Sequence, residues 1–156
     1  MTYEPSVMKY LYGKRPLTVE SYETVSHALD VMENANKNAI GVQNFGKFAG
    51  IFTQSDFIKR VLRHDLNPSI TSIFDVMTAN PQTVTPDCGI TAAYEIMVRR
   101  GINHLPVVDC ETGLRGIITE EELRGDVQDW MDKTIKEYKM VMGYIHGESY
   151  GIGANY

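Results

Sequence analysis

The segment Gly50-Ile51-Phe52-Thr53-Gln54-Ser55-Asp56-Phe57 returns 66 residues later (116 minus 50) as Gly116-Ile117-Ile118-Thr119-Glu120-Glu121-Glu122-Leu123. A matching start lies upstream of each copy, Pro16-Leu17-Thr18-Val19 in the first and Pro81-Gln82-Thr83-Val84 in the second, 65 residues apart (81 minus 16). A period of this length, kept to within one residue, indicates duplication of a whole supersecondary unit. Two units that pack on each other form a pseudo-symmetric cleft, and we expect a ligand site there.

Each copy carries the same predicted order of elements: strand, helix, strand, strand, helix. The first helix of each copy has apolar residues at helical spacing, at Val25, Ala28, Leu29 and Met32 and again at Ile90, Ala93, Tyr94 and Met97. Asn36 and Gly101 stand at the ends of these helices, and both residue types tolerate the left-handed conformation that closes a helix. Apolar runs at 39–42 and 48–52, and at 104–108 and 114–118, flank Gly-containing turns and predict two hairpins.

The remaining segments complete a fold of the α/β (α+β) class. Further helices are predicted at 54–62 and 120–142, with a short helical turn at 72–78 between the units. Met131, Ile135, Tyr138 and Met142 repeat at helical spacing on the last helix, so we expect this face to pack on the body or on a dimer mate. Residues 143–156 contain four glycines and are predicted to form a flexible tail.

Length and composition indicate an ordinary soluble globular protein. The chain has 156 residues, 43% of them hydrophobic, which suffices for one compact domain or two small halves that share a core. A net charge of −5, with both signs mixed along the chain, argues against a general nucleic-acid binder. No apolar run approaches the roughly 18 residues of a membrane span, and the N-terminus lacks the pattern of a secretion signal. We therefore expect a cytoplasmic protein whose two cysteines, Cys88 and Cys110, are reduced.

Three segments together resemble a tandem pair of CBS domains, also called a Bateman module. They are Asp75-Val76-Met77-Thr78 leading into 80–84, then His104-Leu105-Pro106-Val107-Val108-Asp109, and finally the two Gly-h-h-Thr-x-x-acid segments, where h is an apolar residue. Each segment is short, and the resemblance rests on their order, spacing and duplication. It covers residues 10–135, with one CBS domain at 10–66, a linker at 67–80, a second domain at 81–135, and the end of the last helix with the tail at 136–156.

The resemblance implies a fold and a class of ligand. The fold has two β-α-β-β-α units packed pseudo-symmetrically through their sheets, with the helices outside, and such modules commonly form homodimers. Many members of the CBS family, which this sequence resembles, bind an adenosyl compound, such as AMP, ADP, ATP or S-adenosylmethionine, in clefts between the units.

The segment that follows the first hairpin carries chemistry for such a ligand. Asp56 offers two acceptor oxygens to ribose hydroxyls, the hydroxyls of Thr53 and Ser55 can donate to a phosphate, and Arg60 adds positive charge. In the resembling family, the acid of this motif holds the ribose and the Thr/Ser positions face the phosphate. The alternative is a capping box, in which Thr53 and Asp56 satisfy the helix-start N–H groups without a ligand. The duplicated pattern favours ribose binding for Asp56.

The second copy departs from the family pattern, because Glu122 stands where the family usually has Asp. Glu is one methylene longer and is the better capping-box partner. Glu120 and Glu121 also place negative charge beside any phosphate. For Thr119 and Glu122, which occupy the matching ligand positions, we therefore favour a structural cap over a second ribose site.

The base of the ligand is expected deeper in the cleft. In relatives, the backbone at the positions of Thr18-Val19 and Thr83-Val84 reads the edge of adenine. Family members also place residues near the ligand at the start of the middle strand, which here marks Asn38, Ala39, Asn103, His104 and Pro106 as candidates. For His104, a packed structural role is an equally good interpretation.

Neither a catalytic site nor a metal site is predicted. The four histidines are scattered, and the chain has no P-loop, nucleophile elbow or dinucleotide fingerprint. The sequence thus predicts a stand-alone regulatory module that binds an adenosyl compound and signals to an unidentified partner protein. The alternative is a dimeric interaction scaffold with the same fold and no physiological nucleotide. Nucleic-acid binding through Lys59, Arg60, Arg63 and His64 is the least favoured hypothesis.

Overall fold

The computed structural model describes residues 3–145 and shows two similar units. The first unit contains β1 (Thr18–Glu20), α1 (Val25–Asn34), β2 (Ala39–Asn44), β3 (Lys47–Thr53) and α2 (Gln54–Asp56). The helix that α2 begins continues through a π-helical turn, η2 (Phe57–Val61), and a 3-10 turn, η3 (Leu62–His64). The predicted order of elements is confirmed, and the last helical segment ends at His64 rather than Leu62.

The second unit repeats this order. It contains α4 (Ile90–Arg100), β5 (His104–Asp109), β6 (Gly113–Thr119) and α5 (Glu120–Ile145). Its expected first strand is reduced to a parallel bridge between Val84 and Val107. Two short helices, η1 (Val7–Tyr10) and α3 (Ile73–Val76), precede the first and second units, and β4 (Thr78–Ala79) follows α3. The predicted α/β class is therefore confirmed, with a shortened first strand in the second unit.

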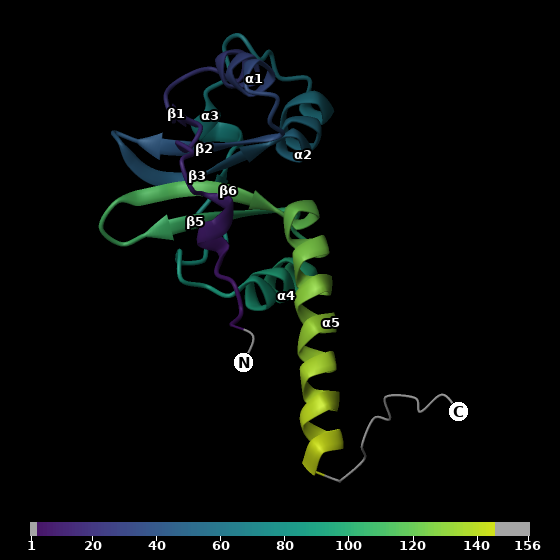
Figure 1. Cartoon of the computed structure of the whole chain (residues 1–156). Helices are drawn as coiled ribbons and strands as arrows, with labels where there is room; N and C mark the ends of the chain where they lie inside the picture. The colour runs from purple at the N-terminus through teal and green to yellow at the C-terminus, as the bar shows by residue number, and fades with distance from the viewer. Residues whose placement is uncertain (1–2, 146–156) are drawn as a thin grey trace.

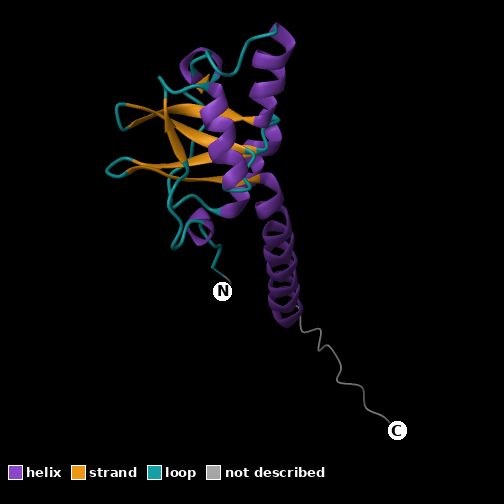
Figure 2. Cartoon of the chain, turned by 90° about the horizontal axis from the view of Figure 1, so that it is seen from above, coloured by secondary structure: helices purple, strands orange, loops and turns teal. Residues whose placement is uncertain are grey.

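The two sheets lie between the helices, with α1 and α3 outside the first sheet and α4 outside the second (Figure 1, Figure 2). The first sheet has the order β1-β2-β3-β4, and the second is the antiparallel β5–β6 hairpin. Strand β6 packs on β2 and β3. The side chain of Leu114 occupies the position that a Cβ at residue 41 would take, so Gly41 allows the sheets to approach closely.

Each short helix packs in the unit that it does not directly precede. Val7 N–H donates to Cys88 O at 2.8 Å, and Ile73 N–H donates to Glu23 O at 2.9 Å. As a result, η1 and the residue after it contribute Val7 and Leu11 to the core of the second unit, and α3 and the residue after it contribute Ile73, Val76 and Met77 to the core of the first. The segment 67–80, interpreted above as a linker, thus supplies part of a core.

The ends of the two long repeated helices are closed as their sequences predict. Asn36 follows α1 with a φ of 51°, and Gly101 follows α4 with a φ of 61°. The predicted core stripes are also confirmed at Val25, Ala28 and Met32 and at Ile90, Ala93 and Met97, all at most 4% exposed. Local pattern therefore decides both the buried face and the stop of each helix.

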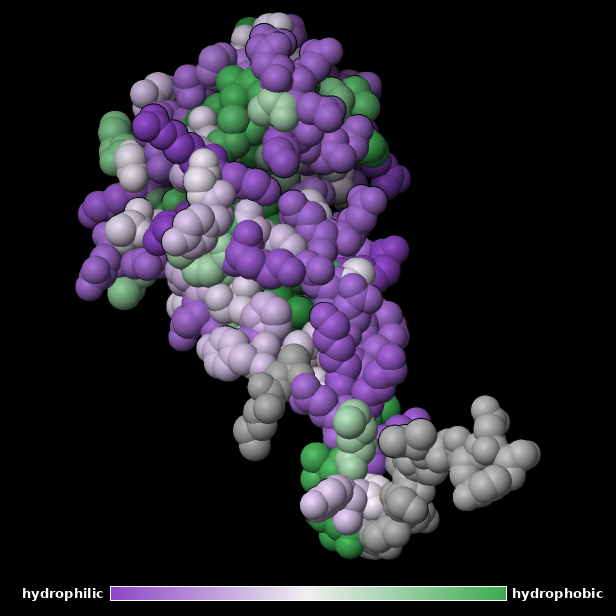
Figure 3. All heavy atoms as spheres, in the orientation of Figure 1, coloured by the Kyte–Doolittle hydropathy of each residue, from purple (hydrophilic) through white to green (hydrophobic). Residues whose placement is uncertain are grey.

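The last helix, α5, extends well beyond the body of the protein (Figure 1, Figure 2). Its Leu123 and Val127 are buried, but farther along Ile135 is 50% and Tyr138 is 64% exposed, and apolar atoms gather at its far end (Figure 3). The expectation that this face packs on the body is therefore wrong within one chain, whereas packing on a dimer mate stays a prediction. Because α5 ends at Ile145, the predicted tail is wrong for residues 143–145, and 146–156 lie outside the described residues.

Candidate functional site

A cleft of about 830 Å³ lies between the start of α2 and the start of α5, and we call it the first cleft. Because β3 and β6 end at Thr53 and Thr119, the two repeated segments meet there. Most of the predicted ligand residues line it, namely Asn38, Thr53, Ser55, Asp56, Arg60, Asn103, His104 and Thr119. Small-molecule sites typically enclose roughly 300–1,000 Å³, so the first cleft has the size of a nucleoside-sized ligand site.

Asp56 is only 8% exposed, and its carboxylate is hydrogen-bonded within the first unit. Oδ2 accepts from Thr53 N–H at 3.0 Å and from the Thr53 hydroxyl at 3.1 Å, while Asp56 N–H donates to Thr53 Oγ1 at 3.2 Å. This is a complete capping box. Oδ1 accepts from the Thr78 hydroxyl at 3.1 Å. Since a carboxylate has about four acceptor positions, one remains, and the cap and a ribose contact are compatible.

Arg60 connects the first cleft to the segment between the units. Its Nη1 donates to Met77 O and, at 3.2 Å, to Val76 O, and its Nε lies 3.7 Å from Asp56 Oδ1. These contacts fix the guanidinium beside the carboxylate. Lys59, by contrast, lines the cleft, is exposed, and forms no ion pair within residues 3–145.

The charges that line the first cleft balance. Its cationic side chains are Lys59, Arg60 and Arg124, and its carboxylates are Asp56, Glu120 and Glu121. Arg124 is occupied by Glu120, because its Nε donates to Glu120 Oε1 at 2.9 Å and its Nη2 contacts Oε2. The first cleft therefore offers polar contacts without the strong positive potential that a polyphosphate needs.

His104 faces the first cleft from β5, and burial lowers its pKa below the ordinary value. The carboxylates of Asp56 and Glu122 act in the opposite direction but do not overcome the desolvation. His104 is therefore neutral at pH 7, when it can both donate and accept one hydrogen bond.

The lowered pKa of His104 predicts a loss of stability in mild acid. Below the ordinary pKa of about 6.5, the unfolded chain takes up a proton at this position more readily than the folded chain, so stability rises with pH across this window. We expect the melting temperature to fall more between pH 7.5 and pH 5.5 in the parent protein than in His104→Gln, and thermal unfolding at the two pH values measures this. An equal fall in both proteins would contradict the assignment.

A second, smaller cleft of about 90 Å³ is lined by two more of the predicted ligand residues, Ala39 and Glu122. Glu122 is the acid of the second Gly-h-h-Thr-x-x-acid segment. Glu122 Oε2 accepts from Thr119 N–H at 2.9 Å, and Glu122 N–H donates to Thr119 Oγ1 at 3.2 Å. The cap favoured from the sequence is therefore present. Tyr10, Leu11 and Leu114 also line this second cleft, so the two clefts are not equivalent.

The other predicted residues line neither cleft. They are Thr18, Val19, Thr83, Val84 and Pro106. Val19 and Val84 are core residues, 4% and 8% exposed, and both backbone groups of Val84 are used, its N–H by Pro106 O and its carbonyl by Val108 N–H. The geometry thus gives no support to a role of these residues in reading the base.

Residues that were not among the predicted ligand residues line the first cleft as well. Pro81 and Gln82, directly before Thr83, line it, and so do Thr78 and Arg124. Pro81 and Gln82 belong to the matching start of the second copy, directly ahead of the predicted ligand residues Thr83 and Val84. Thr78 belongs to a segment that carries the family resemblance, but nothing local predicts its contact with Asp56, because this contact depends on α3 packing in the first unit.

The CBS domain family matches the chain twice, at residues 9–63 and 73–129. The chain belongs to this family. The first match covers the first unit with the end of η1, and the second covers all of α3 and the second unit as far as the first part of α5. The tandem CBS pair expected from the repeat is therefore confirmed.

Relatives of this CBS pair differ greatly in length. The chain is 30% identical to the meiotically up-regulated gene 70 protein of Schizosaccharomyces pombe, where the match covers 69% of this chain but 15% of that protein. It is 32% identical to the uncharacterized protein MJ1426 of Methanocaldococcus jannaschii, over 70% of this chain and 84% of that protein. The same pair thus occurs within a much longer protein and as most of a short one.

Solved structures share the fold. A putative signal-transduction protein with CBS domains from Burkholderia ambifaria aligns with a TM-score of 0.72 and 26% identity, covering 79% of this chain and 93% of that one. The CBS domain pair of protein MJ0100, in complex with 5′-methylthioadenosine and S-adenosyl-L-methionine, aligns with a TM-score of 0.65 and 27% identity, covering 75% and 95%.

Among residues 3–145, none of the helices is both long and apolar enough to cross a membrane. Within the same residues, no cluster of three or more His, Cys, Asp or Glu side chains is arranged to hold a metal ion.

Proposed function

We propose that this CBS pair is a regulatory module that binds an adenosyl compound in the first cleft. The observation that carries the proposal is the position of Asp56, a buried carboxylate with spare acceptor capacity on the wall of an 830 Å³ cleft built by both units. Proteins with CBS pairs are generally regulatory rather than catalytic. The adenosyl ligands of the similar MJ0100 pair support the same ligand class here.

The balanced charge of the first cleft narrows the class of ligand. Glu120 and Glu121 stand across from Lys59 and Arg60, and Arg124 is already paired with Glu120. Each added phosphate would bring negative charge beside these carboxylates, where water screens it only in part. We therefore expect S-adenosylmethionine or AMP to bind more tightly than ADP, and ADP more tightly than ATP.

A ligand in the first cleft would contact both units, because Thr53 and Asp56 belong to the first and His104 and Thr119 to the second. Binding would favour the arrangement of the units that fits the ligand best, which is a shift between pre-existing arrangements. An unidentified partner protein would read this arrangement. The two free thiols, Cys88 and Cys110, fit a cytoplasmic location for the module.

Thermal unfolding with a panel of ligands tests the proposal. The panel contains AMP, ADP, ATP, S-adenosylmethionine and NAD, each added to the full chain. A ligand at 100 times its dissociation constant adds about 2.7 kcal/mol of stability, which for a chain of this size raises the melting temperature by roughly 5–10 °C. A flat response to every compound would contradict the proposal and favour the interaction scaffold.

We further propose that α5 pairs with α5 of a second copy to form a homodimer. Met131, Ile135, Tyr138 and Val141 form an exposed apolar stripe, each at least 48% exposed, which continues the face that buries Leu123 and Val127. Figure 3 shows apolar atoms at this end of the helix. An apolar stripe that extends beyond the body of the protein and stays exposed is typical of a protein–protein contact.

Charged substitutions in this stripe should separate the dimer. We expect the parent protein to sediment as a dimer and the variant Ile135→Asp with Tyr138→Asp to sediment as a monomer, because two carboxylates of each copy would be buried between the helices. Lys136→Gln, an exposed change off the stripe, serves as the control and should remain dimeric. A monomeric parent protein at high micromolar concentration, or a dimeric double variant, would rule out pairing through α5.

A further inference from the structure

The second cleft is strongly cationic, although the chain as a whole carries a net charge of −5. Lys14, Arg15, Lys37 and Arg115 line it, against the single carboxylate of Glu122. These cations come from separate places in the fold: the loop between η1 and β1, the loop between α1 and β2, and strand β6. The fold therefore gathers positive charge from distant parts of the sequence at this point.

Most of this positive charge is not neutralised by the protein. Arg115 Nη1 lies 3.8 Å from Asp109 Oδ2, a long ion pair. Lys14, Arg15 and Lys37 take part in none of the ion pairs formed by the described part of the chain. A cleft lined by uncompensated charge of one sign raises the local concentration of ions of the other sign.

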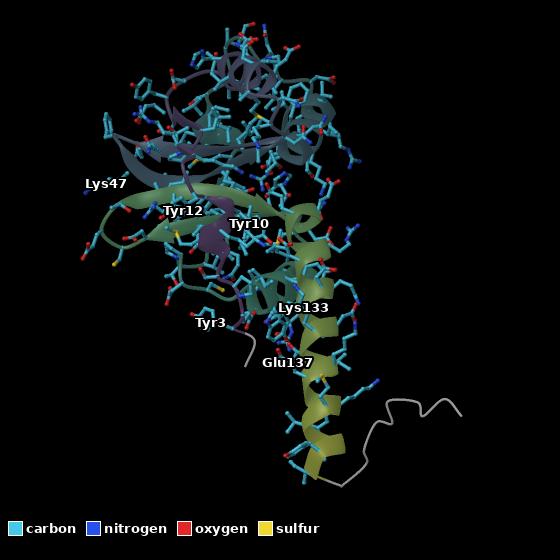
Figure 4. All side chains as sticks on the ribbon, viewed as in Figure 1. Tyr3, Tyr10, Tyr12, Lys47, Lys133 and Glu137 are labelled. Carbon is cyan, nitrogen blue, oxygen red and sulfur yellow. The ribbon has the colours of Figure 1, made fainter. Side chains whose placement is uncertain are left out.

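The second cleft is small for a nucleoside. Its volume is about 90 Å³, well below the roughly 300 Å³ at the lower end of small-molecule sites. Tyr10 and Leu11 from the N-terminal segment and Leu114 from β6 form its apolar wall. Leu11 packs directly against Gly116, since a Cβ added at Gly116 would come within 2.6 Å of Leu11 Cδ2. Tyr10, labelled in Figure 4, is held by a hydrogen bond, since its hydroxyl donates to Asp126.

We propose that the second cleft binds a compact phosphate anion, of which inorganic pyrophosphate is the simplest multivalent form. The guanidinium of Arg15 can donate two parallel hydrogen bonds to phosphate oxygens, and Lys14 and Lys37 supply point charges around them. An anion of this kind fits a small cationic cleft, whereas an adenosyl compound requires the first cleft. This site is independent of the proposed adenosyl site, because the two clefts share none of their lining residues.

Calorimetric titration of the full chain with pyrophosphate alone tests the site. We expect binding that weakens by at least about tenfold in the double variant Arg15→Gln with Lys37→Gln, since a hydrogen bond to a charged group contributes about 1.5–3 kcal/mol. The matched control is Lys47→Gln with Lys133→Gln, which removes the same charge at the β2–β3 hairpin and on α5 (Figure 4). The control should bind pyrophosphate like the parent protein.

Three outcomes would overturn the proposal. Equal weakening of pyrophosphate binding in the two double variants would show that the affinity depends only on the overall charge of the protein. Loss of binding in Lys59→Gln, with no loss in the Arg15 and Lys37 variant, would place the anion in the first cleft. ADP that binds as tightly as pyrophosphate, and loses its affinity in the Arg15 and Lys37 variant, would show that the second cleft accommodates a nucleoside. None of these depends on whether an adenosyl compound binds in the first cleft.

Discussion

Asp56→Asn is expected to weaken the binding of S-adenosylmethionine or AMP by about 10- to 100-fold, the range that follows from losing hydrogen bonds to a charged acceptor. The amide keeps the shape of the side chain, and its oxygen can still accept from Thr53 N–H, so the cap that Asp56 forms is largely retained. What the variant removes is the charged oxygen beside Thr78 and Arg60, which we assign to a ribose hydroxyl. Calorimetric titration of both compounds measures the loss.

Glu122→Gln provides the matched control for this change. It makes the same replacement of carboxylate by amide in the same capping box of the other unit, but Glu122 lines the second cleft. We expect it to leave adenosyl binding unchanged. Parent-like affinity in Asp56→Asn, or an equal loss in Glu122→Gln, would show that Asp56 serves only as a helix cap.

Ile73→Ala is expected to lower the free energy of unfolding by about 2–5 kcal/mol, as for other large-to-small changes in a core. Ile73 is 0% exposed although it lies between the two repeated units in the sequence. Its side chain belongs to the core of the first unit, together with Val76 and Met77. The loss therefore measures the packing of α3 in the unit that precedes it. Urea denaturation of the parent and the variant determines the difference.

Ile70→Ala makes the same chemical change three residues earlier, at a side chain that is 80% exposed. We expect a difference within about 0.5 kcal/mol for such a surface position. If the two variants were equally stable, α3 would not be packed in the core, and the contact between Thr78 and Asp56 that depends on it would also be in doubt.

Local sequence pattern predicts most of the fold of this protein. The spacing of Ala28 and Met32, and of Ala93 and Met97, identifies the buried face of each long repeated helix. Gly and Asn predict where these helices stop, because few other residues adopt a positive φ without strain. The two hairpins follow from apolar runs on either side of a turn. These features depend on residues close together in the chain, and each pattern occurs in both copies of the repeat.

The exchange of short helices could not be predicted in the same way. The N-terminal segment with Val7 and Leu11 is too short to show a helical period, and nothing local indicates that it packs in the second unit. The sequence predicts its counterpart at Ile73 as a helical turn, but its docking in the first unit depends on backbone hydrogen bonds to Glu23 and Ser21, far away in the sequence. Long-range packing of this kind is decided by the whole fold.

The candidate site was predictable to a similar degree. The repeated Thr-x-x-acid segments led to Asp56 and Thr119, because strands that end in equivalent positions bring their following residues together. Only part of the difference between the two clefts could be predicted from the sequence. Glu122 indicated a cap, but the narrowing of the second cleft comes from Tyr10, Leu11 and Leu114, which approach it from elsewhere in the fold.

Backbone amide NMR of the full chain during titration with S-adenosylmethionine tests the central claim most directly, since it reports both whether and where the compound binds. We predict saturable shifts concentrated at 53–56, 59–60, 78, 82, 101–104, 119–121 and 124, positions that line the first cleft. Shifts confined to 10–17 and 114–117 around the second cleft, or no saturable shift with either S-adenosylmethionine or AMP, would contradict the account.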